Sequence, residues 1–151
     1  MINEFVDFLQ SGPWQIDGGL SGELEKRGHD LSDKLWSARL LRDEPSAIAQ
    51  VHQDYVDAGA RVIITASYQA SRQGFEAFGL SQNKADDLMR LSISLAKNVA
   101  SKAPQKVWVA ASVGPYGAVL GGGQEYVGNY GVSHEDLVSF HQERIAVLAS
   151  E

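Results

Sequence analysis

Three short apolar runs, separated by helical patterns, constrain the fold of this chain more than any other feature. They occupy residues 14–17, 62–68 and 107–113, so they recur roughly every 45 residues, and each leads into small or polar residues. The unbroken Val62-Ile63-Ile64 is typical of a strand buried on both faces of a parallel sheet. Helices between successive strands require crossover connections, which make the strands parallel. The sequence therefore predicts an α/β fold in the order β-α-β-α-β-α.

The helices are predicted from apolar residues that recur at three- and four-residue intervals. Ser133, with Asp136 three residues later, predicts the cap of the last helix, and Gly59 predicts the end of the helix that starts at Pro45. Residues 71–75 predict either a connection or a short helix. We expect helical segments at residues 3–10, 20–26, 35–41, 45–58, 81–101 and 134–149.

The predicted sheet is small for its type. Three strands are fewer than the usual ~5–6 of a sheet, and no linker divides the chain into further domains. A parallel sheet of this size leaves apolar edges uncovered. We therefore expect the isolated chain to self-associate.

The composition limits the classes of protein to consider. The chain has 151 residues, 44% hydrophobic and 21% charged, which is typical of one soluble globular domain with its own core. A net charge of −6 without any basic cluster argues against a nucleic-acid partner. No apolar run approaches the ~20 residues of a membrane span, and the N-terminus does not resemble a signal peptide, so we expect a cytoplasmic protein. The lack of cysteine excludes disulfides, thiolate nucleophiles and cysteine-ligated metal within the chain.

The first candidate site residues are Asp17, Gly18 and Gly19, where the first apolar run ends. In one interpretation Asp17 anchors the amino group of a ligand, and the bare glycine backbone lets amides meet a carboxylate. In the other, the three residues form a tight strand-to-helix turn with Asp17 as the helix cap. The pattern alone favours the turn.

The second and third strand ends carry similar small polar residues. Thr65, Ser67 and Tyr68 offer two hydroxyls and an aromatic wall, although the hydroxyls can instead satisfy neighbouring backbone groups. Ser112 and Gly114 end the third run. They lead into the glycine-rich residues 114–131, which predict a ligand-covering loop with Tyr116, Tyr126 and Tyr130 as contact residues. This loop matches neither G-x-G-x-x-G nor a Walker sequence, which argues against phosphate binding.

Other reactive side chains follow no catalytic pattern. His29, His52, His134 and His141 have no metal-binding spacing, so we interpret all four as surface or packing residues. A G-x-S-x-G nucleophile motif is absent. Trp36 lies in an apolar helical stripe, where it either packs in the core or lines the pocket by projecting past the strand ends.

Taken together, these segments resemble the homocysteine S-methyltransferase family, in particular its bacterial branch that uses S-methylmethionine or S-adenosylmethionine as methyl donor. The resemblance extends in order over essentially the whole chain. The segments that carry it are Ile16-Asp17-Gly18-Gly19-Leu20-Ser21-Gly22-Glu23-Leu24-Glu25-Lys26-Arg27-Gly28, Leu35-Trp36-Ser37-Ala38, Ile64-Thr65-Ala66-Ser67-Tyr68-Gln69-Ala70, Ala111-Ser112-Val113-Gly114-Pro115-Tyr116-Gly117-Ala118 and Glu125-Tyr126-Val127-Gly128-Asn129-Tyr130.

The resemblance implies a zinc-dependent (β/α)8 barrel that makes methionine. In that family three cysteines on later strands hold zinc, and zinc binds homocysteine as a thiolate that attacks the methyl group of the donor. Residues 1–151 would then form the N-terminal part of one homocysteine-binding TIM barrel, namely its first three βα units. Since this chain has no cysteine, the zinc ligands would lie outside it, and the chain alone would contain no catalytic residue and be inactive.

The resemblance also implies roles for individual residues. Asp17 matches the residue that holds the homocysteine amino group, with Gly18 and Gly19 as the adjacent backbone. Trp36 matches an aromatic near the donor site. The remaining substrate-binding matches are Thr65, Ser67, Tyr68, Ser112, Gly114 and Tyr116.

Two other hypotheses stay open. One is a catalytically inactive half-barrel that binds an amino acid. The other is a different small α/β enzyme that shares only the chemistry of these strand ends.

Overall fold

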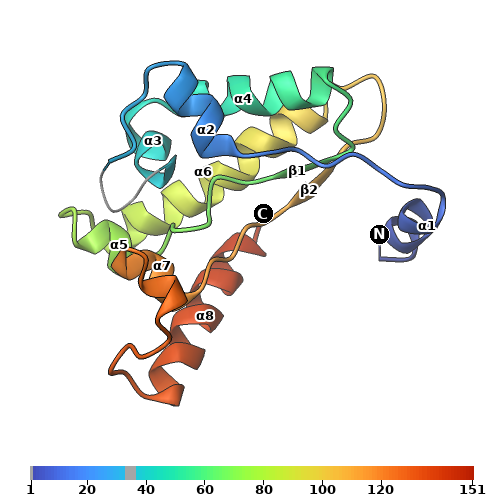
Figure 1. Cartoon of the computed structure of the whole chain (residues 1–151). Coiled ribbons are helices and arrows are strands. Elements are labelled where there is room, and N and C mark those ends of the chain that lie inside the picture. The colour runs from blue at the N-terminus through green and yellow to red at the C-terminus, as the bar shows by residue number, and fades with distance from the viewer. Residues whose placement is uncertain (1, 33–36) are drawn as a thin grey trace.

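The computed structural model describes residues 2–32 and 37–151 and has a small parallel sheet at its centre (Figure 1). The sheet consists of β1 (Val62–Ile64) and β2 (Trp108–Ala110), with Val62 opposite Trp108. Ile16 forms a single parallel bridge to Val62. The predicted α/β class with parallel strands is confirmed, although the first strand is reduced to this bridge.

The strands are shorter than predicted because side chains replace the backbone ladder at their carboxyl ends. The backbone N–H of Thr65 still donates to the carbonyl oxygen of Ala110 over 3.0 Å. The N–H of Ile64, however, donates to the carboxylate of Asp17, and the N–H of Ser112 donates to the hydroxyl of Thr65. These two side-chain acceptors take positions that a backbone carbonyl would otherwise fill, so regular pairing stops.

The predicted helical segments are confirmed to within about two residues, and the beginning of the one predicted at 35–41 lies outside the described residues. The short-helix interpretation of residues 71–75 is also confirmed. The helices are α1 (Ile2–Gln10), α2 (Leu20–Lys26), α3 (Ser37–Asp43), α4 (Pro45–Asp57), α5 (Arg72–Glu76), α6 (Gln82–Ala100), α7 (Tyr116–Leu120), the 3-10 helix η1 (Gln124–Tyr126) and α8 (His134–Leu148).

Two of the predicted helix ends are correct in detail. The hydroxyl of Ser133 accepts from the N–H of Asp136, and the Asp136 carboxylate accepts from the N–H of Ser133, which forms a capping box. Gly59 follows the last residues of α4 with a φ of 102°, a conformation that favours glycine.

The prediction that residues 114–131 form only a loop is wrong, since this segment contains α7 and η1. Ala118 of α7 is fully buried, and burial of this apolar turn favours a helix over an open loop. Gly117 lets η1 approach, because a Cβ at this position would lie 2.7 Å from the backbone of Gln124.

Helices α4 and α6 cover one face of the sheet. Ile63, in the middle of β1, is fully buried there. The opposite face is open, with Ile16 61% and Ile64 36% exposed, so burial of these strands on both faces, as predicted, is wrong for the described chain. The buried residues between the helices and the covered face are Val56, Ala60, Ile63, Ala96, Val99 and Val107.

Helix α1 lies at the amino ends of the strands, on the side of the molecule away from α5 and α7 (Figure 1). The ring of Phe8 in this helix stacks on Trp14, with ring centroids 4.9 Å apart. The rings of Phe5 and Trp108 meet edge to face, with centroids 4.8 Å apart. These aromatic side chains cover the amino ends of the strands. The polar residues that follow the strands lie at the opposite, carboxyl ends.

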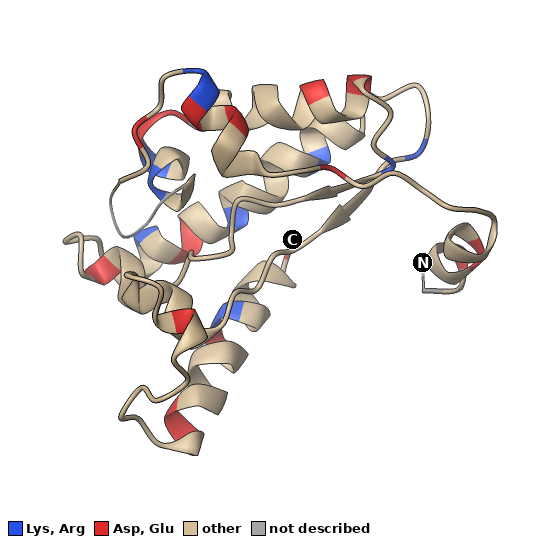
Figure 2. Cartoon of the chain, viewed as in Figure 1, with Lys and Arg blue, Asp and Glu red and all other residues tan. Residues whose placement is uncertain are grey.

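The surface carries mixed charges and an open sheet face. Figure 2 shows Lys and Arg interspersed with Asp and Glu rather than gathered on one element. In the described parts of the chain, no helix has both the length and the apolar character to cross a membrane. Self-association of the isolated chain through the uncovered edges of its sheet stays a prediction.

We predict that Ile63→Ala lowers the free energy of unfolding by about 2–5 kcal/mol, because it removes a fully buried side chain between β1 and the helices. Ile64→Ala is the matched control, since it makes the same truncation at the next residue, which is 36% exposed. We expect a smaller loss for this control. Urea denaturation followed by circular dichroism measures both, and equal losses would contradict a core on one face only.

Candidate functional site

A cavity of about 290 Å³ lies at the carboxyl ends of the strands. Its walls come from the residues after the Ile16 bridge, from the ends of β1 and β2, and from the starts of α2 and α3. The carboxyl ends of parallel strands are where α/β folds bind their ligands, so this cavity is the candidate site. The lining residues are Asp17, Gly18, Leu20, Ser21, Ser37, Ile64, Thr65, Ala66, Tyr68 and Ser112.

Asp17 is the charged group of this cavity. Its side chain is buried, and its Oδ2 accepts from the N–H of Ile64 over 2.7 Å. Its Oδ1 is also buried but has no hydrogen-bond partner among the described residues. Burial raises the pKa of Asp17 above its ordinary value, and the hydrogen bond from Ile64 offsets part of this rise. The carboxylate therefore has an acceptor oxygen to offer to a cationic donor.

The helix-cap interpretation of Asp17 is wrong. Helix α2 begins after Gly19, which is its N-cap and makes no side-chain cap hydrogen bond, while Asp17 bonds across to β1 instead. Gly18 and Gly19 are exposed. A Cβ on Gly18 would lie 2.8 Å from the hydroxyl oxygen of Tyr55, so this phenol from α4 packs directly against the bare backbone.

The hydroxyls of Thr65 and Ser67 join the two strand ends. Ser67 donates to the carbonyl oxygen of Ser112 at 2.8 Å, and the N–H of Ser112 donates to the Thr65 hydroxyl at 3.1 Å. The two hydroxyl oxygens lie 2.7 Å apart. Because the Ser67 proton is already used, Thr65 is the donor in that third bond. The alternative that these hydroxyls satisfy neighbouring backbone groups is therefore confirmed.

Tyr68 forms an aromatic wall of the cavity and is 38% exposed. Burial of its ring and the nearby Glu125 carboxylate raise the pKa of Tyr68, so its hydroxyl stays protonated at neutral pH. Its carbonyl oxygen accepts from the N–H of Gly114 over 3.1 Å. A Cβ on Gly114 would lie 2.5 Å from that oxygen, so only glycine permits this approach.

Arg144 from α8 is a residue of this region that the sequence analysis missed. It is buried, and its guanidinium donates to the carbonyl oxygens of Gly114, Ser67 and Tyr68 at 2.8–2.9 Å. A single arginine in an amphipathic helix pattern is typical of a solvated side chain, so no local pattern indicated this contact. Tyr55 of α4, whose hydroxyl packs against Gly18, is the second residue of this region that the sequence analysis did not single out.

The structure brings half of the predicted site residues into one cavity: Asp17, Gly18, Thr65, Tyr68 and Ser112. Gly19, Ser67 and Gly114 lie beside it along the chain but do not line it. Tyr116 packs instead against Phe140 and Tyr130, with ring centroids 5.0 and 5.5 Å away. Trp36 lies outside the described residues.

The residues present do not fit a metal ion. The described parts of the chain hold no group of three or more His, Asp or Glu side chains that could ligate one, and the sequence has no cysteine. His52 is buried in α4, where desolvation lowers its pKa to about 4, so it is neutral at pH 7. It packs in the interior, as expected of a packing residue.

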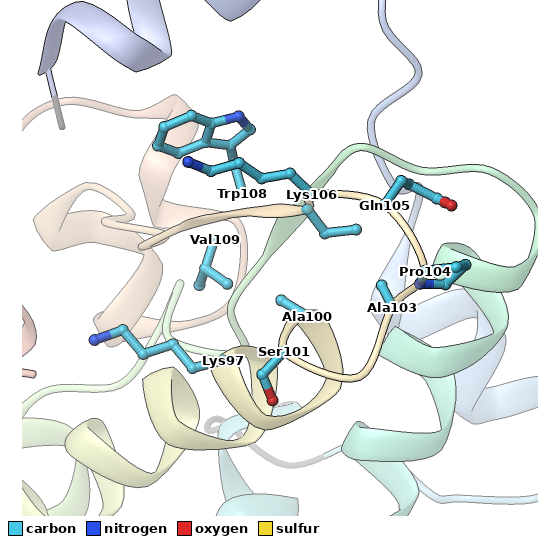
Figure 3. Close-up of a pocket in the computed structure, with 10 residues that line it drawn as sticks. Lys97, Ala100, Ser101, Ala103, Pro104, Gln105, Lys106, Trp108 and Val109 are labelled. Carbon is cyan, nitrogen blue, oxygen red and sulfur yellow. The ribbon is translucent and has the colours of Figure 1, made fainter.

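A larger hollow of about 660 Å³ lies near the amino end of β2, beside the last turn of α6. In Figure 3 the side chains of Lys97 and Ser101 come from the helix, and those of Lys106 and Trp108 from the opposite segment. The Lys106 amino group lies 4.2 Å from the centre of the Trp108 ring and also pairs with Glu4. The described lining residues include no carboxylate and no histidine, so the titratable side chains that line this hollow are those of Lys97 and Lys106.

Comparison with known proteins finds one family and relatives that carry its name. Residues 15–151 match the protein family described as homocysteine S-methyltransferase. Homocysteine S-methyltransferase YbgG of Bacillus subtilis is 44% identical over 146 residues, which cover 88% of this chain and 45% of that protein. Homocysteine S-methyltransferase 2 of Zea mays is 46% identical over 161 residues, covering 98% of this chain and 47% of the relative.

A solved structure has the same fold. The crystal structure of the homocysteine methyltransferase MmuM from Escherichia coli, in its metallated form, matches with a TM-score of 0.86 and 42% identity. The match covers 95% of this chain and 52% of that one. The chain thus spans about half the length of the relatives that it matches.

We predict that Asp17→Asn raises the free energy of unfolding at pH 7. Folding raises the pKa of Asp17, so the wild-type chain loses stability as pH rises from the ordinary value of 3.8 to the raised one, and the amide variant does not titrate. The gain should disappear below the ordinary pKa, where both side chains are neutral. Urea midpoints between about pH 3 and pH 8 measure it.

Asp54→Asn is the control of opposite sign, because a hydrogen bond from Arg27 lowers the pKa of this exposed carboxylate. We expect this variant to lose a little stability at neutral pH. A clear loss of stability at neutral pH for Asp17→Asn would contradict the assignment of Asp17 as a carboxylate held at a cost in stability.

Proposed function

The chain belongs to the homocysteine S-methyltransferase family, and we propose that it supplies the amino-acid-binding half of an enzyme that methylates homocysteine to give methionine. The buried Asp17 carboxylate carries this proposal, because it lines a cavity at the strand ends and its Oδ1 has no hydrogen-bond partner among the described residues. A protonated amino group provides both the charge and the N–H donors that this oxygen lacks. The methyl donor that we propose is S-methylmethionine or S-adenosylmethionine.

The other residues of the cavity would orient the amino acid. Asp17 binds the ammonium group of the amino acid. The exposed backbone of Gly18 and Gly19 beside it offers N–H groups to the carboxylate of the same amino acid. Tyr68 and Ser112 line the wall along which the side chain of the substrate extends.

The remaining predicted residues act less directly in this proposal. Thr65 and Ser67 use their hydroxyls to join the strand ends. They therefore stabilise the cavity wall and have no free hydroxyl proton to donate to the ligand. Gly114 and Tyr116 shape the segment after β2. Trp36 keeps the role of an aromatic near the methyl donor.

Among the described residues, no group of side chains would hold a metal ion that activates the thiol. Methyl transfer needs the homocysteine sulfur as a thiolate. Because the residues present do not fit zinc, we propose that the ligands of a zinc ion come from outside residues 1–151. The chain alone then binds the amino acid without transferring a methyl group.

The barrel architecture is also part of the proposal. The parallel order of the Ile16 bridge, β1 and β2, with helices between them, is that of successive βα units. We propose that residues 1–151 form the first three units of a (β/α)8 barrel in a cytoplasmic enzyme. The similarity to about half of the Escherichia coli enzyme supports this arrangement.

We predict that L-methionine and L-homocysteine bind the chain weakly, and that Asp17→Asn weakens this binding at least about tenfold, because a charged partner is lost. Heteronuclear NMR titration measures the affinity. Asp30→Asn serves as the matched control, since its exposed carboxylate bonds to its own turn at Ser32. Equal affinities for the wild type and Asp17→Asn would overturn the assignment of the ammonium site.

The same samples test catalysis. With isotopically labelled homocysteine, either methyl donor and added zinc, we expect no labelled methionine from this chain by mass spectrometry. The Escherichia coli homocysteine methyltransferase is the positive control. Formation of labelled methionine by the chain alone would contradict the proposed need for zinc ligands from outside residues 1–151.

Binding without turnover is also what the inactive half-barrel hypothesis expects. Turnover restored by the remaining half of a relative would favour the enzyme.

A further inference from the structure

Arg144 is a buried cation that pairs with carbonyl oxygens rather than with a carboxylate. It is 1% exposed, and in the described parts of the chain no Asp or Glu forms an ion pair with it. Burial lowers the pKa of Arg144 to about 10, so the guanidinium still carries its charge at neutral pH. Burying a charge without a counterion is costly, which means that these contacts are not incidental to the fold.

The three carbonyls belong to the two strand ends. Nη2 donates to Ser67 at 2.9 Å and to Tyr68 at 2.8 Å, both just after β1. Nη1 donates to Gly114 at 2.9 Å, just after β2. One planar group from α8 therefore fixes the distance between two segments that lie more than 40 residues apart in the sequence.

These segments also carry walls of the cavity. Tyr68 is itself a lining residue, and its carbonyl oxygen accepts from both Arg144 and the N–H of Gly114. Ser67 reaches the lining residue Ser112 through its hydroxyl. A change in the position of the guanidinium would therefore move the Tyr68 wall and the Ser112 backbone relative to Asp17.

We infer that Arg144 is a positioning residue of the candidate site, which sets the separation of the two strand ends and so the width of the amino-acid cavity. This inference rests on the proposed function for the identity of the occupant, but the geometry of the strand ends is independent of it. Arg144 does not line the cavity and acts through the backbone carbonyl oxygens of Ser67, Tyr68 and Gly114.

The test compares Arg144→Lys with Arg72→Lys. Lysine keeps the charge, but its single nitrogen cannot span carbonyls on both segments in the same fork geometry. Arg72 is the control, because it is a half-buried arginine that donates twice to Asp86 at 2.8 Å and also pairs with Glu143 of α8, but makes no hydrogen bond to the carbonyl oxygens of Ser67, Tyr68 or Gly114. We expect Arg144→Lys to weaken L-methionine binding about tenfold and Arg72→Lys to change it less than about threefold, even at similar urea midpoints.

Two further readouts separate positioning from general stability. The amide NMR signals of Gly114 and Ser112 should shift in Arg144→Lys and stay in place in Arg72→Lys. Guanidinium ion at millimolar concentration should partly restore both the signals and the binding of Arg144→Ala, whereas urea should not. Where Arg144→Ala does not fold, the lysine variant alone decides.

Unchanged Gly114 and Ser112 signals in folded Arg144→Lys would overturn the inference, as would an equal loss of binding in both lysine variants. If the wild-type chain binds no methionine, the proposed function fails. The amide signals then still decide whether Arg144 fixes the strand ends.

Discussion

The closure of the two strand ends by side chains is the interaction on which the rest of this structure depends. Each strand has only three residues, so the backbone ladder supplies few hydrogen bonds. The hydroxyls of Thr65 and Ser67 and the guanidinium of Arg144 complete the pairing beyond the point where the ladder stops. Because Thr65, Ser67 and Arg144 are themselves buried, their bonds hold the two ends in one arrangement, and the cavity forms as a consequence of that arrangement.

Local patterns predicted the helices well and the strands only in part. Capping and apolar spacing act within a few residues, so Ser133 and Gly59 mark real helix ends. The strands were predicted too long because residues such as Thr65 and Asp17 look like strand ends only when their side chains are seen to accept the N–H groups of Ser112 and Ile64. Those bonds join segments far apart in the sequence, which no local pattern describes.

A site residue was predictable from the sequence where its chemistry depends on its own side chain. It was not predictable where its role depends on how closely distant segments of the chain approach one another. Asp17 was identified as a carboxylate at a strand end, and the structure places it in the cavity. Arg144 could not be identified, because its role depends on which carbonyls it meets. The need for glycine at position 114 likewise comes from the carbonyl oxygen of Tyr68, which would lie 2.5 Å from a Cβ.

Asp17 and the nearby hydroxyls have different roles: Asp17 is free to bind a ligand, whereas the hydroxyls hold the walls of the cavity together. Thr65 and Ser67 have satisfied their donors within the protein, so a ligand gains little from them. Asp17 retains a buried oxygen with which no residue in the described part of the chain pairs, a state that costs stability until a donor binds there. A group held at such a cost binds a cation in preference to a neutral molecule, because a charged donor offsets more of the desolvation of the carboxylate than a neutral donor does. Under the proposed function, the ammonium group of the amino acid is that donor. This chain then contributes the selection of the substrate, and the reactivity of the sulfur depends on groups that the chain does not contain.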